Sequence, residues 1–439
     1  MTGRPGTRGA LIAIVLAAAL LRVVFSGWVV GFHAAPIGDE TDYHAIASHL
    51  LAGDGFCEAG GAPTARRPPA YPVLLAGLYA LTGPSPAAGR VVQVILGVLV
   101  VLLTAAVARR IFDTRVALAA AALAACNPFL AFISGYLLTE NLYMVLVLAA
   151  LWVAPSPRRY GTGPVAAAAA SAALFALAVL ARPTGLPLFE WTAAAVLVLA
   201  VVPLRARAVR LAAMVAVFIV LVLPWYARNA RVVGGWVLTT HGGITFYQGN
   251  NPRIADVPQW RGGVAPLDAL PRYDELAVMP EVERDRLAWQ LGREFVTQHP
   301  SAMPRLVMWK LARFWRLKSD MGLSGIRSGW WWNKNSALGR LAANVDAGFV
   351  YAAAVMPLFV AGVWLTRRRW QDLMLLYGVV VVHTAVAAAF FGSLRGRIPI
   401  EPVICIFAGV TVAGLASALS RRRGASRVPA DSGPAPPGT

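Results

Sequence analysis

The stretch ALIAIVLAAALLRVVFSGWVVG, residues 10–31, holds one charged side chain, Arg22, in 22 residues. An apolar run of about 20 residues is long enough to cross a bilayer as a helix. Arg4 and Arg8 precede it, as they would in a signal peptide. The run is longer than the roughly 7–15 apolar residues of such a peptide, so we predict an uncleaved anchor helix.

Similar runs recur along the 439-residue chain, in which 58% of the residues are hydrophobic and 14% are charged. This composition excludes an ordinary soluble domain and predicts an all-α polytopic membrane protein with about ten transmembrane helices. The predicted spans are residues 10–31, 88–108, 116–134, 138–154, 164–181, 186–203, 209–225, 345–366, 371–391 and 398–419.

The formal net charge of +19 would suggest nucleic acid in a soluble protein, but here most arginines flank apolar runs. We therefore expect membrane lipids and no nucleic acid as partners. With the N-terminus in the cytoplasm, every inner connection carries at least two arginines, as the positive-inside rule requires. These arginines are 109, 110 and 115; 158 and 159; 205, 207 and 210; 367–369; and 421–423.

This topology divides the chain into four parts. Residues 1–225 form an N-terminal transmembrane core with a first outer loop at 32–87, and residues 226–344 form an extracytoplasmic region. Residues 345–420 are C-terminal transmembrane helices, and 421–439 form a disordered cytoplasmic tail, because Pro, Gly and Ser dominate its end.

Short helices are expected in the outer parts. Residues 66–83 contain an apolar segment too short to span, which indicates an interfacial helix. Residues 281–298 predict a surface helix, and 304–318 a helix lying at the bilayer surface. The Gly- and Asn-rich stretch THGGITFYQGNNP, residues 240–252, is interpreted as loop.

The densest acidic cluster, PIGDETDYH at residues 36–44, directly follows the first span. One interpretation makes Asp39 the N-cap of a helix over about 41–52, with its acidic neighbours favoured by the helix dipole. The other makes Asp39 a general base at the membrane surface. Glu40 and His44 are one turn apart and could share a face, although two such ligands are a weak metal signal.

A set of arginines near the outer ends of the spans is not explained by topology. An arginine fork suits a phosphate, which predicts an anion site, whereas each arginine alone could equally bind a lipid headgroup or snorkel. The set comprises Arg66, Arg67, Arg182, Arg228, Arg395 and Arg397.

Three further polar residues lie at or within predicted spans. Glu140 stands at the outer start of the fourth span. Arg22 is intramembrane and is by default a functional hypothesis. His383, in the ninth span, is expected to be a packed histidine with satisfied hydrogen bonds.

Several motifs in this order resemble GT-C membrane glycosyltransferases that use polyprenyl-phosphate sugars, such as protein O-mannosyltransferases and aminoarabinose transferases. The motifs are GDETDYH (38–44), RRPPAYPVLLAGLYALTG (66–83), TENLY (139–143), ARPTGL (181–186), LPWYARNARVVGGWV (223–237), GGITFYQGNNP (242–252), HPSAMPRLVMWKLARFW (299–315) and RGRIPIEP (395–402).

The resemblance implies a polyprenyl-phosphate-sugar donor and a hydroxyl acceptor of the cell envelope, with the active site facing outward from a bacterial plasma membrane. Asp39 would be the catalytic base and Glu140 would line the cavity. Glu40, Tyr43 and His44 would bind substrate.

The same resemblance implies that Arg66 or Arg67, Arg182, Arg395 and Arg397 hold the donor phosphate. One-step displacement predicts inversion at the sugar carbon, and a covalent intermediate on Glu140 stays open. No cofactor is indicated with certainty, and the use of a divalent metal also stays open.

Three rival functions are weighed against the transferase. A transporter or lipid flippase would place polar groups near the bilayer midplane, where only Arg22 and His383 are found. A non-catalytic envelope scaffold would use the outer loops for partners. An O-antigen ligase or polymerase is an enzyme of a related kind.

Overall fold

The computed structural model describes residues 5–154, 165–199, 202–317 and 347–425. These residues are mostly helical, and within them the sole β-type pairing is the isolated bridge Cys57–Pro63. The predicted inner arginines 158 and 159 and the tail beyond residue 425 lie outside the described residues.

The helices of the first half are α1 (Pro5–Val24), a π-helix (Phe25–Val30), α2 (Asp39–Ala52), α3 (Ala70–Thr82), α4 (Pro86–Ile111), α5 (Thr114–Cys126), α6 (Pro128–Ile133), α7 (Glu140–Val153), α8 (Val165–Ala181), α9 (Gly185–Leu199) and α10 (Leu204–Val232). Those of the second half are α11 (Gly242–Gly249), α12 (Arg253–Asp256), α13 (Tyr273–Val278), α14 (Glu281–Gln298), α15 (Met303–Trp315), α18 (Ala347–Thr366), α19 (Met374–Ala389), α20 (Leu394–Arg397) and α21 (Glu401–Ala425).

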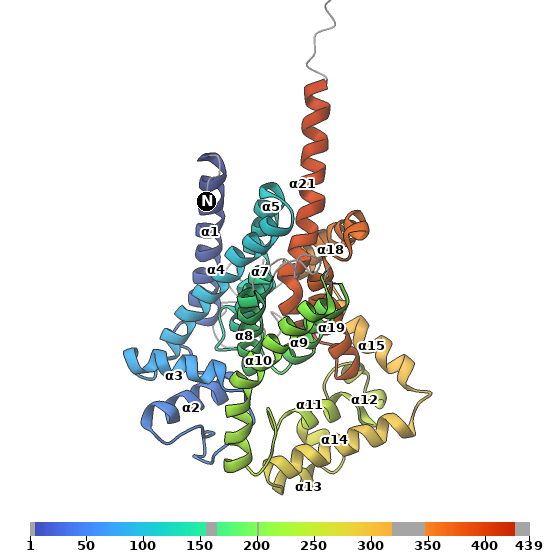
Figure 1. The fold of residues 1–439 in the computed structure, drawn as a ribbon. Coiled ribbons are helices and arrows are strands. Elements are labelled where there is room, and N and C mark those ends of the chain that lie inside the picture. Colours follow the sequence, from blue (N-terminus) through green and yellow to red (C-terminus); the bar gives the residue numbers. More distant parts are fainter. Residues whose placement is uncertain (1–4, 155–164, 200–201, 318–346, 426–439) are drawn as a thin grey trace, which may run out of the picture.

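The long apolar helices form a bundle in which α21 packs on both α5 and α18, and α7 and α8 pack on each other (Figure 1). The short helices α2, α3, α11, α13 and α14 gather at one end of this bundle (Figure 1). The start of α1 and the final turns of α21 extend to the opposite end. The outer segments are therefore collected on one side of the bundle.

Five of the described helices are long and apolar enough to cross a membrane by length and composition. They are Gly6–Val30, α4, α10, Ala347–Arg369 (which includes α18) and Leu394–Arg421 (which includes most of α21). Shorter apolar helices occur at α3, α5, α7, α8, α9 and α19. The predicted spans all fall on helices of these two groups. The chain is a multi-pass membrane protein, and the total of ten spans stays a prediction.

Two arginine-rich connections meet at the end of the bundle away from the short helices. Arg115 donates a hydrogen bond to Ser417 at 3.1 Å, and Arg369 donates one to the carbonyl of Ile111 at 3.1 Å. Arg115 and Arg369, both expected on the inner side, thus belong to connections that lie together.

The intramembrane Arg22 has a structural task. Its guanidinium is fully buried and donates to the carbonyls of Ala124 and Ala125, both at 3.3 Å, at the last turn of α5. A cation at a helix C-terminus pairs with unsatisfied carbonyls and with the negative end of the dipole. Arg22 therefore ties α1 to α5.

The loop interpretation of residues 240–252 is wrong, because the structure has helix α11 there. The carboxylate of Asp285 accepts a hydrogen bond from the Gly243 N–H at 2.6 Å at the start of this helix. A Cβ on Gly243 would lie 2.0 Å from the Asp285 carbonyl oxygen, and one on Gly249 would lie 1.9 Å from that of Phe390. These glycines permit close packing, and tertiary contacts override their low helix propensity.

The tight contact between α18 and α21 yields a stability prediction. A Cβ on Gly362 would lie 1.9 Å from the carbonyl oxygen of Phe407, whereas Gly414 on α21 has nothing within 4 Å. We expect Gly362→Ala to destabilise the protein by about 1–3 kcal/mol, because the helices must separate. Gly414→Ala should be neutral or stabilising, since alanine favours helix.

Thermal unfolding of the two variants in the same detergent measures this difference. Equal midpoints for Gly362→Ala and Gly414→Ala would contradict the close helix contact.

Candidate active site

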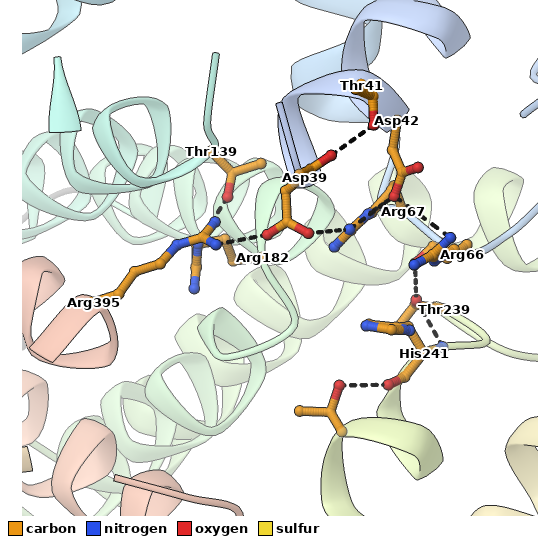
Figure 2. A network of polar contacts seen from close by, with 12 residues as sticks. Asp39, Thr41, Asp42, Arg66, Arg67, Thr139, Arg182, Thr239, His241 and Arg395 are labelled. Carbon is orange, nitrogen blue, oxygen red and sulfur yellow. Dashed lines mark hydrogen bonds and ion pairs between the residues drawn. The ribbon is translucent and has the colours of Figure 1, made fainter. Parts of the chain in front are cut away.

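The carboxylate of Asp39 lies between two guanidinium groups (Figure 2). Its Oδ1 pairs with Nη2 of Arg67, and its Oδ2 accepts a bond from Nη1 of Arg395 at 2.6 Å. The N-cap of α2 is Gly38 and no side chain caps the helix, so the expected N-cap role of Asp39 is wrong. The first residue of α2 instead bonds across the structure.

Arg67 is anchored on three sides. Its Nε and Nη2 donate to Oδ2 of Asp42 at 2.9 and 2.8 Å, and its guanidinium lies 5.3 Å from the ring centroid of Tyr43. Arg66 approaches the same Asp42 oxygen at 3.7 Å. One turn of α2 therefore fixes both arginines relative to Asp39.

Glu140, the first residue of α7, bonds two other arginines of this cluster, Arg395 and Arg182. Its Oε1 accepts from Nε of Arg395 at 2.5 Å and pairs with Nη1 of Arg182 at 2.8 Å. Arg182 also donates to Oγ1 of Thr139 at 2.8 Å. The Glu140 side chain is 0% exposed, so it acts from behind the two arginines.

The segment that carries Arg66 and Arg67 is held by the region after α10. The carboxylate of Glu281 accepts from Thr64 Oγ1 at 2.9 Å and from the Ala65 N–H at 2.8 Å. The hydroxyl of Thr239 donates to the carbonyl of Arg66 at 2.6 Å. These bonds fix the backbone that aims both guanidinium groups.

All these elements surround one cavity of about 1500 Å³. Of the residues predicted as the site, six line it: Asp39, Tyr43, Arg66, Arg67, Arg182 and Arg395. Glu140 reaches the group through its bonds to Arg182 and Arg395. Glu40, His44 and Arg397 do not line the cavity.

Glu40 points into the protein beneath α2. Its Oε1 accepts from the Leu137 N–H at 2.7 Å, and its Oε2 from the Ile37 N–H at 3.2 Å. The guanidinium of Arg90 lies 3.5 Å away. Glu40 thereby links α2 to the loop that leads to Thr139 and Glu140.

His44 and Arg397 also have protein partners. His44 Nδ1 is 2.9 Å from the hydroxyl of Tyr79, while Glu40, one turn earlier on α2, bonds to Leu137 and Ile37 instead. Arg397 is fully buried, and its Nε donates to Glu401 at 2.9 Å. Its neighbour Arg395 faces the cavity because residues two apart on a helix point about 200° apart.

His383 is both packed and cavity-lining. Its Nδ1 lies 2.8 Å from the carbonyl of Val379, which can only accept, so Nε2 accepts from the Tyr143 hydroxyl at 3.2 Å. The expectation of a histidine with satisfied hydrogen bonds is thus met by these two partners.

The cavity keeps Asp39 ionised and His241 neutral. Burial would raise the pKa of Asp39, but the positive charges of Arg395 and Arg67 outweigh it and hold the pKa well below its usual range. Burial and the charges of Arg67 and Arg66 lower the pKa of His241 to about 3. Asp39 is therefore charged but a weak base in this arrangement.

The sequence interpretation missed the cavity residues contributed by the region after α10. They are Gly235, Trp236, Val237, Leu238, Thr239, His241, Gly242, Thr245, Gln248, Val264, Val282, Asp285, Arg286, Trp289, Gln290, Arg293, Glu294 and Thr297. The one available signal was the polar spacing of three and four residues along 281–298, which had indicated only a surface helix.

The residues around Asp39 do not fit a metal ion. Both of its carboxylate oxygens are bonded to guanidinium groups, which compete with a cation. Across the described ranges, no group of three His, Cys, Asp or Glu side chains is arranged to hold one.

The comparisons with known proteins agree on the fold. A model of the dolichyl-phosphate-mannose-protein mannosyltransferase family matches residues 66–226. No curated protein sequence matches the chain.

Among solved structures, the oligosaccharyltransferase AglB from Archaeoglobus fulgidus, in complex with an inhibitory peptide and a dolichol-phosphate, superposes with a TM-score of 0.53 at 15% identity, covering 97% of this chain and 52% of AglB. The same enzyme in complex with Zn and sulfate gives 0.52 at 14% identity, covering 93% and 50%. ArnT from Cupriavidus metallidurans, bound to undecaprenyl phosphate, gives 0.44 at 14% identity, covering 96% and 81%.

The chain spans about half the length of AglB. The superposition on AglB confirms the GT-C fold that the sequence motifs predicted.

Asp285, which lines the cavity and caps α11, yields a prediction on pH and stability. Burial raises its folded-state pKa from 3.8 to about 6. The folded protein therefore binds more protons than the unfolded chain between these values, and stability falls as pH rises from about 4 to 6. Asp285→Asn keeps an oxygen acceptor for Gly243 and carries no charge, so this fall should disappear.

Thermal midpoints between pH 4 and 7.5 test the effect. Asp274→Asn, an exposed change on α13, serves as the matched control and should keep the wild-type pH dependence. An unchanged pH profile in Asp285→Asn would show that the buried carboxyl is not the source.

Proposed function

We propose that this protein is an integral membrane glycosyltransferase that moves a sugar from a polyprenyl-phosphate donor to a hydroxyl group of an envelope acceptor. The observation that carries the proposal is the Asp39 carboxylate held between Arg67 and Arg395 in one cavity. A base and several phosphate-binding groups within one cavity are what this transfer requires.

The comparisons support the donor class. The matching family model is described by a dolichyl-phosphate-mannose donor, and AglB was solved with a dolichol-phosphate. A lipid phosphate that already activates the sugar needs no nucleotide-binding fold.

The donor phosphate would bind Arg395 and Arg182, whose side chains are partly exposed to the cavity. Glu140 orients both guanidinium groups from behind. Apolar cavity residues from α9 and α19, among them Pro187, Val386 and Ala387, would receive the first isoprene units.

The charges of the site match such a donor. Four guanidinium groups face three carboxylates, which leaves one positive charge, and a phosphodiester brings one negative charge. These groups are Arg66, Arg67, Arg182 and Arg395 against Asp39, Asp42 and Glu140.

The charge balance would also hold through the reaction. The acceptor oxygen bonds to the anomeric carbon, and the bond from that carbon to the phosphate oxygen breaks. The electron pair passes to the phosphate, while the acceptor proton passes to Asp39. One negative charge thus moves from Asp39 to the phosphate, and the arginines stabilise it there.

Donor binding would also activate the base. A phosphate that takes Arg395 weakens its hold on Asp39, so the pKa of Asp39 rises toward a value suited to proton transfer. Glu140, buried and bonded to two arginines, is poorly placed as a nucleophile, which favours one displacement with inversion.

The proposed active site faces outward from a bacterial plasma membrane. The cavity is lined by residues of α2, α11 and α14, and these helices lie at the end of the bundle opposite the final turns of α21 (Figure 1). Arg115 bonds Ser417 in the second half of α21, and the positive-inside rule puts such arginines in the cytoplasm. The transporter alternative rested on two polar residues within the spans, Arg22 and His383. Arg22 no longer supports it, because its hydrogen bonds tie α1 to α5.

The base role predicts the effect of Asp39→Asn. We expect sugar transfer to fall by about 10²–10⁴-fold, because asparagine cannot accept the proton. The assay incubates protein in lipid nanodiscs with a panel of radiolabelled polyprenyl-phosphate sugars and cell-envelope extract. Asp54→Asn, an exposed acid of the same loop outside the cavity, should transfer normally. Full activity of Asp39→Asn would rule out the base role.

The phosphate role predicts the effect of Arg395→Ala. We expect a higher donor KM and a kcat lower by about 10²–10³-fold, since both the bound and the leaving phosphate lose a donor. Arg272→Ala, which removes an exposed arginine paired with Glu275, is the control and should behave as wild type. An unchanged dependence on donor concentration in Arg395→Ala would count against phosphate recognition.

A further inference from the structure

The cavity has room for a second substrate. Its volume of about 1500 Å³ exceeds the roughly 300–1000 Å³ that usually holds one small ligand. A sugar phosphate at Arg182 and Arg395 would leave space on the side lined by α14.

The α14 side is continuous with the charged cluster. The backbone N–H of His241 donates a hydrogen bond to Oγ1 of Thr239, and the Thr239 hydroxyl donates one to the carbonyl of Arg66. In Figure 2, His241 lies across the charged cluster from Arg395. Gly242 follows at once and lies against the ring of Trp289 on α14. An acceptor lying along α14 would therefore reach the Asp39 cluster past His241.

One face of α14 forms this part of the wall. Its cavity-lining residues recur every three or four positions, as one side of a helix requires. They are Val282, Asp285, Arg286, Trp289, Gln290, Arg293, Glu294 and Thr297. The next helix along the chain, α15, contributes only Phe314 to the lining.

This face offers hydrogen-bond donors and acceptors side by side. Arg286 and Arg293 carry guanidinium donors and form no ion pair with any other described residue, and the Arg293 guanidinium lies 5.4 Å from the ring centroid of Trp289. The Glu294 carboxylate accepts a hydrogen bond from the Gln290 amide at 2.8 Å. Each sugar hydroxyl both donates and accepts, so a mixed set of planar side chains matches a polyol.

Other acceptor classes fit this wall less well. A lipid acceptor would need an apolar wall. A polyanion would need a positive wall, but on α14 the two acids Asp285 and Glu294 balance the two arginines Arg286 and Arg293. A carbohydrate also binds aromatic faces, and Trp236, 66% exposed, edges the same cavity. A Cβ on Gly235, next to Trp236, would lie 3.0 Å from the Val282 side chain, so this loop borders α14.

We propose that the α14 face, together with His241 and Trp236, is the acceptor subsite and that it takes a carbohydrate chain. This assignment rests on the proposed glycosyltransferase function. The neutral imidazole of His241 holds the attacking hydroxyl near Asp39, and the α14 side chains hold the sugar units that follow.

The first test asks which class of acceptor becomes labelled. A cell envelope is separated into a delipidated, protease-treated polysaccharide fraction, a lipid fraction and a protein fraction. Each is offered with the radiolabelled donor panel. Label in the polysaccharide fraction supports the subsite, and label confined to lipid or protein overturns it while leaving the transferase function standing.

The second test compares a cavity-facing double variant of α14 with a control variant on the same helix. Gln290→Ala combined with Arg293→Ala should raise the polysaccharide concentration for half-maximal rate about tenfold and leave the donor KM unchanged. Gln298→Ala removes the same amide from an exposed position of α14 outside the cavity and should change neither value. An effect on donor KM alone, or an equal effect of Gln298→Ala, overturns the assignment.

The third test does not depend on turnover. Binding of the polysaccharide fraction is measured by calorimetry on Asp39→Asn protein in nanodiscs without donor. Binding that the combined Gln290→Ala and Arg293→Ala changes weaken about tenfold supports the subsite. This result stands even if the wild-type protein consumes no donor, which would count against the transferase function alone. Absence of binding overturns the subsite.

Discussion

The ion pairs of Asp39 with Arg67 and Arg395, together with the pair between Glu140 and Arg395, join three parts of the chain that are far apart in sequence. Asp39 and Arg395 are separated by 356 positions and meet at 2.6 Å. Each charge is partly withdrawn from water, so none is stable there without the others. The first outer loop, the start of α7 with Glu140, and α20 with Arg395 are therefore held in one geometry by electrostatics, and the cavity lies around that contact.

The same constraint gives the cavity two chemically different sides. Where α9 and α19 line it, Pro187 and Ala387 present apolar surface suited to a lipid tail. Where α14 lines it, Gln290 and Arg293 present hydrogen-bonding groups suited to a hydrated chain. A reaction between a membrane-bound donor and a polar acceptor needs such a division, with the charged cluster as their meeting point.

The sequence pattern predicted the bundle and most of the charged cluster, because apolar run length and arginine placement are local signals. It could not separate neighbours on a helix. Asp39 faces the cavity and Glu40 the Leu137 loop, although both stood in the same acidic motif. Likewise Arg395 reaches Asp39 while Arg397 is buried against Glu401. In each pair, the rotation of the helix about its axis decides which side chain faces the cavity. Packing against the rest of the protein sets that rotation.

The sequence by itself determined that this is a helical membrane protein with an acidic group and several arginines outside the apolar runs, and its motifs resembled those of GT-C glycosyltransferases. The reason is that burial in lipid forces long apolar runs and positive flanks on any such chain. Only the tertiary structure decided that residues 242–249 form a helix capped by Asp285, and that α14 is a cavity wall. Both depend on contacts between distant segments. The three- and four-residue spacing along 281–298 indicates a two-sided helix, but it does not say what either side contacts.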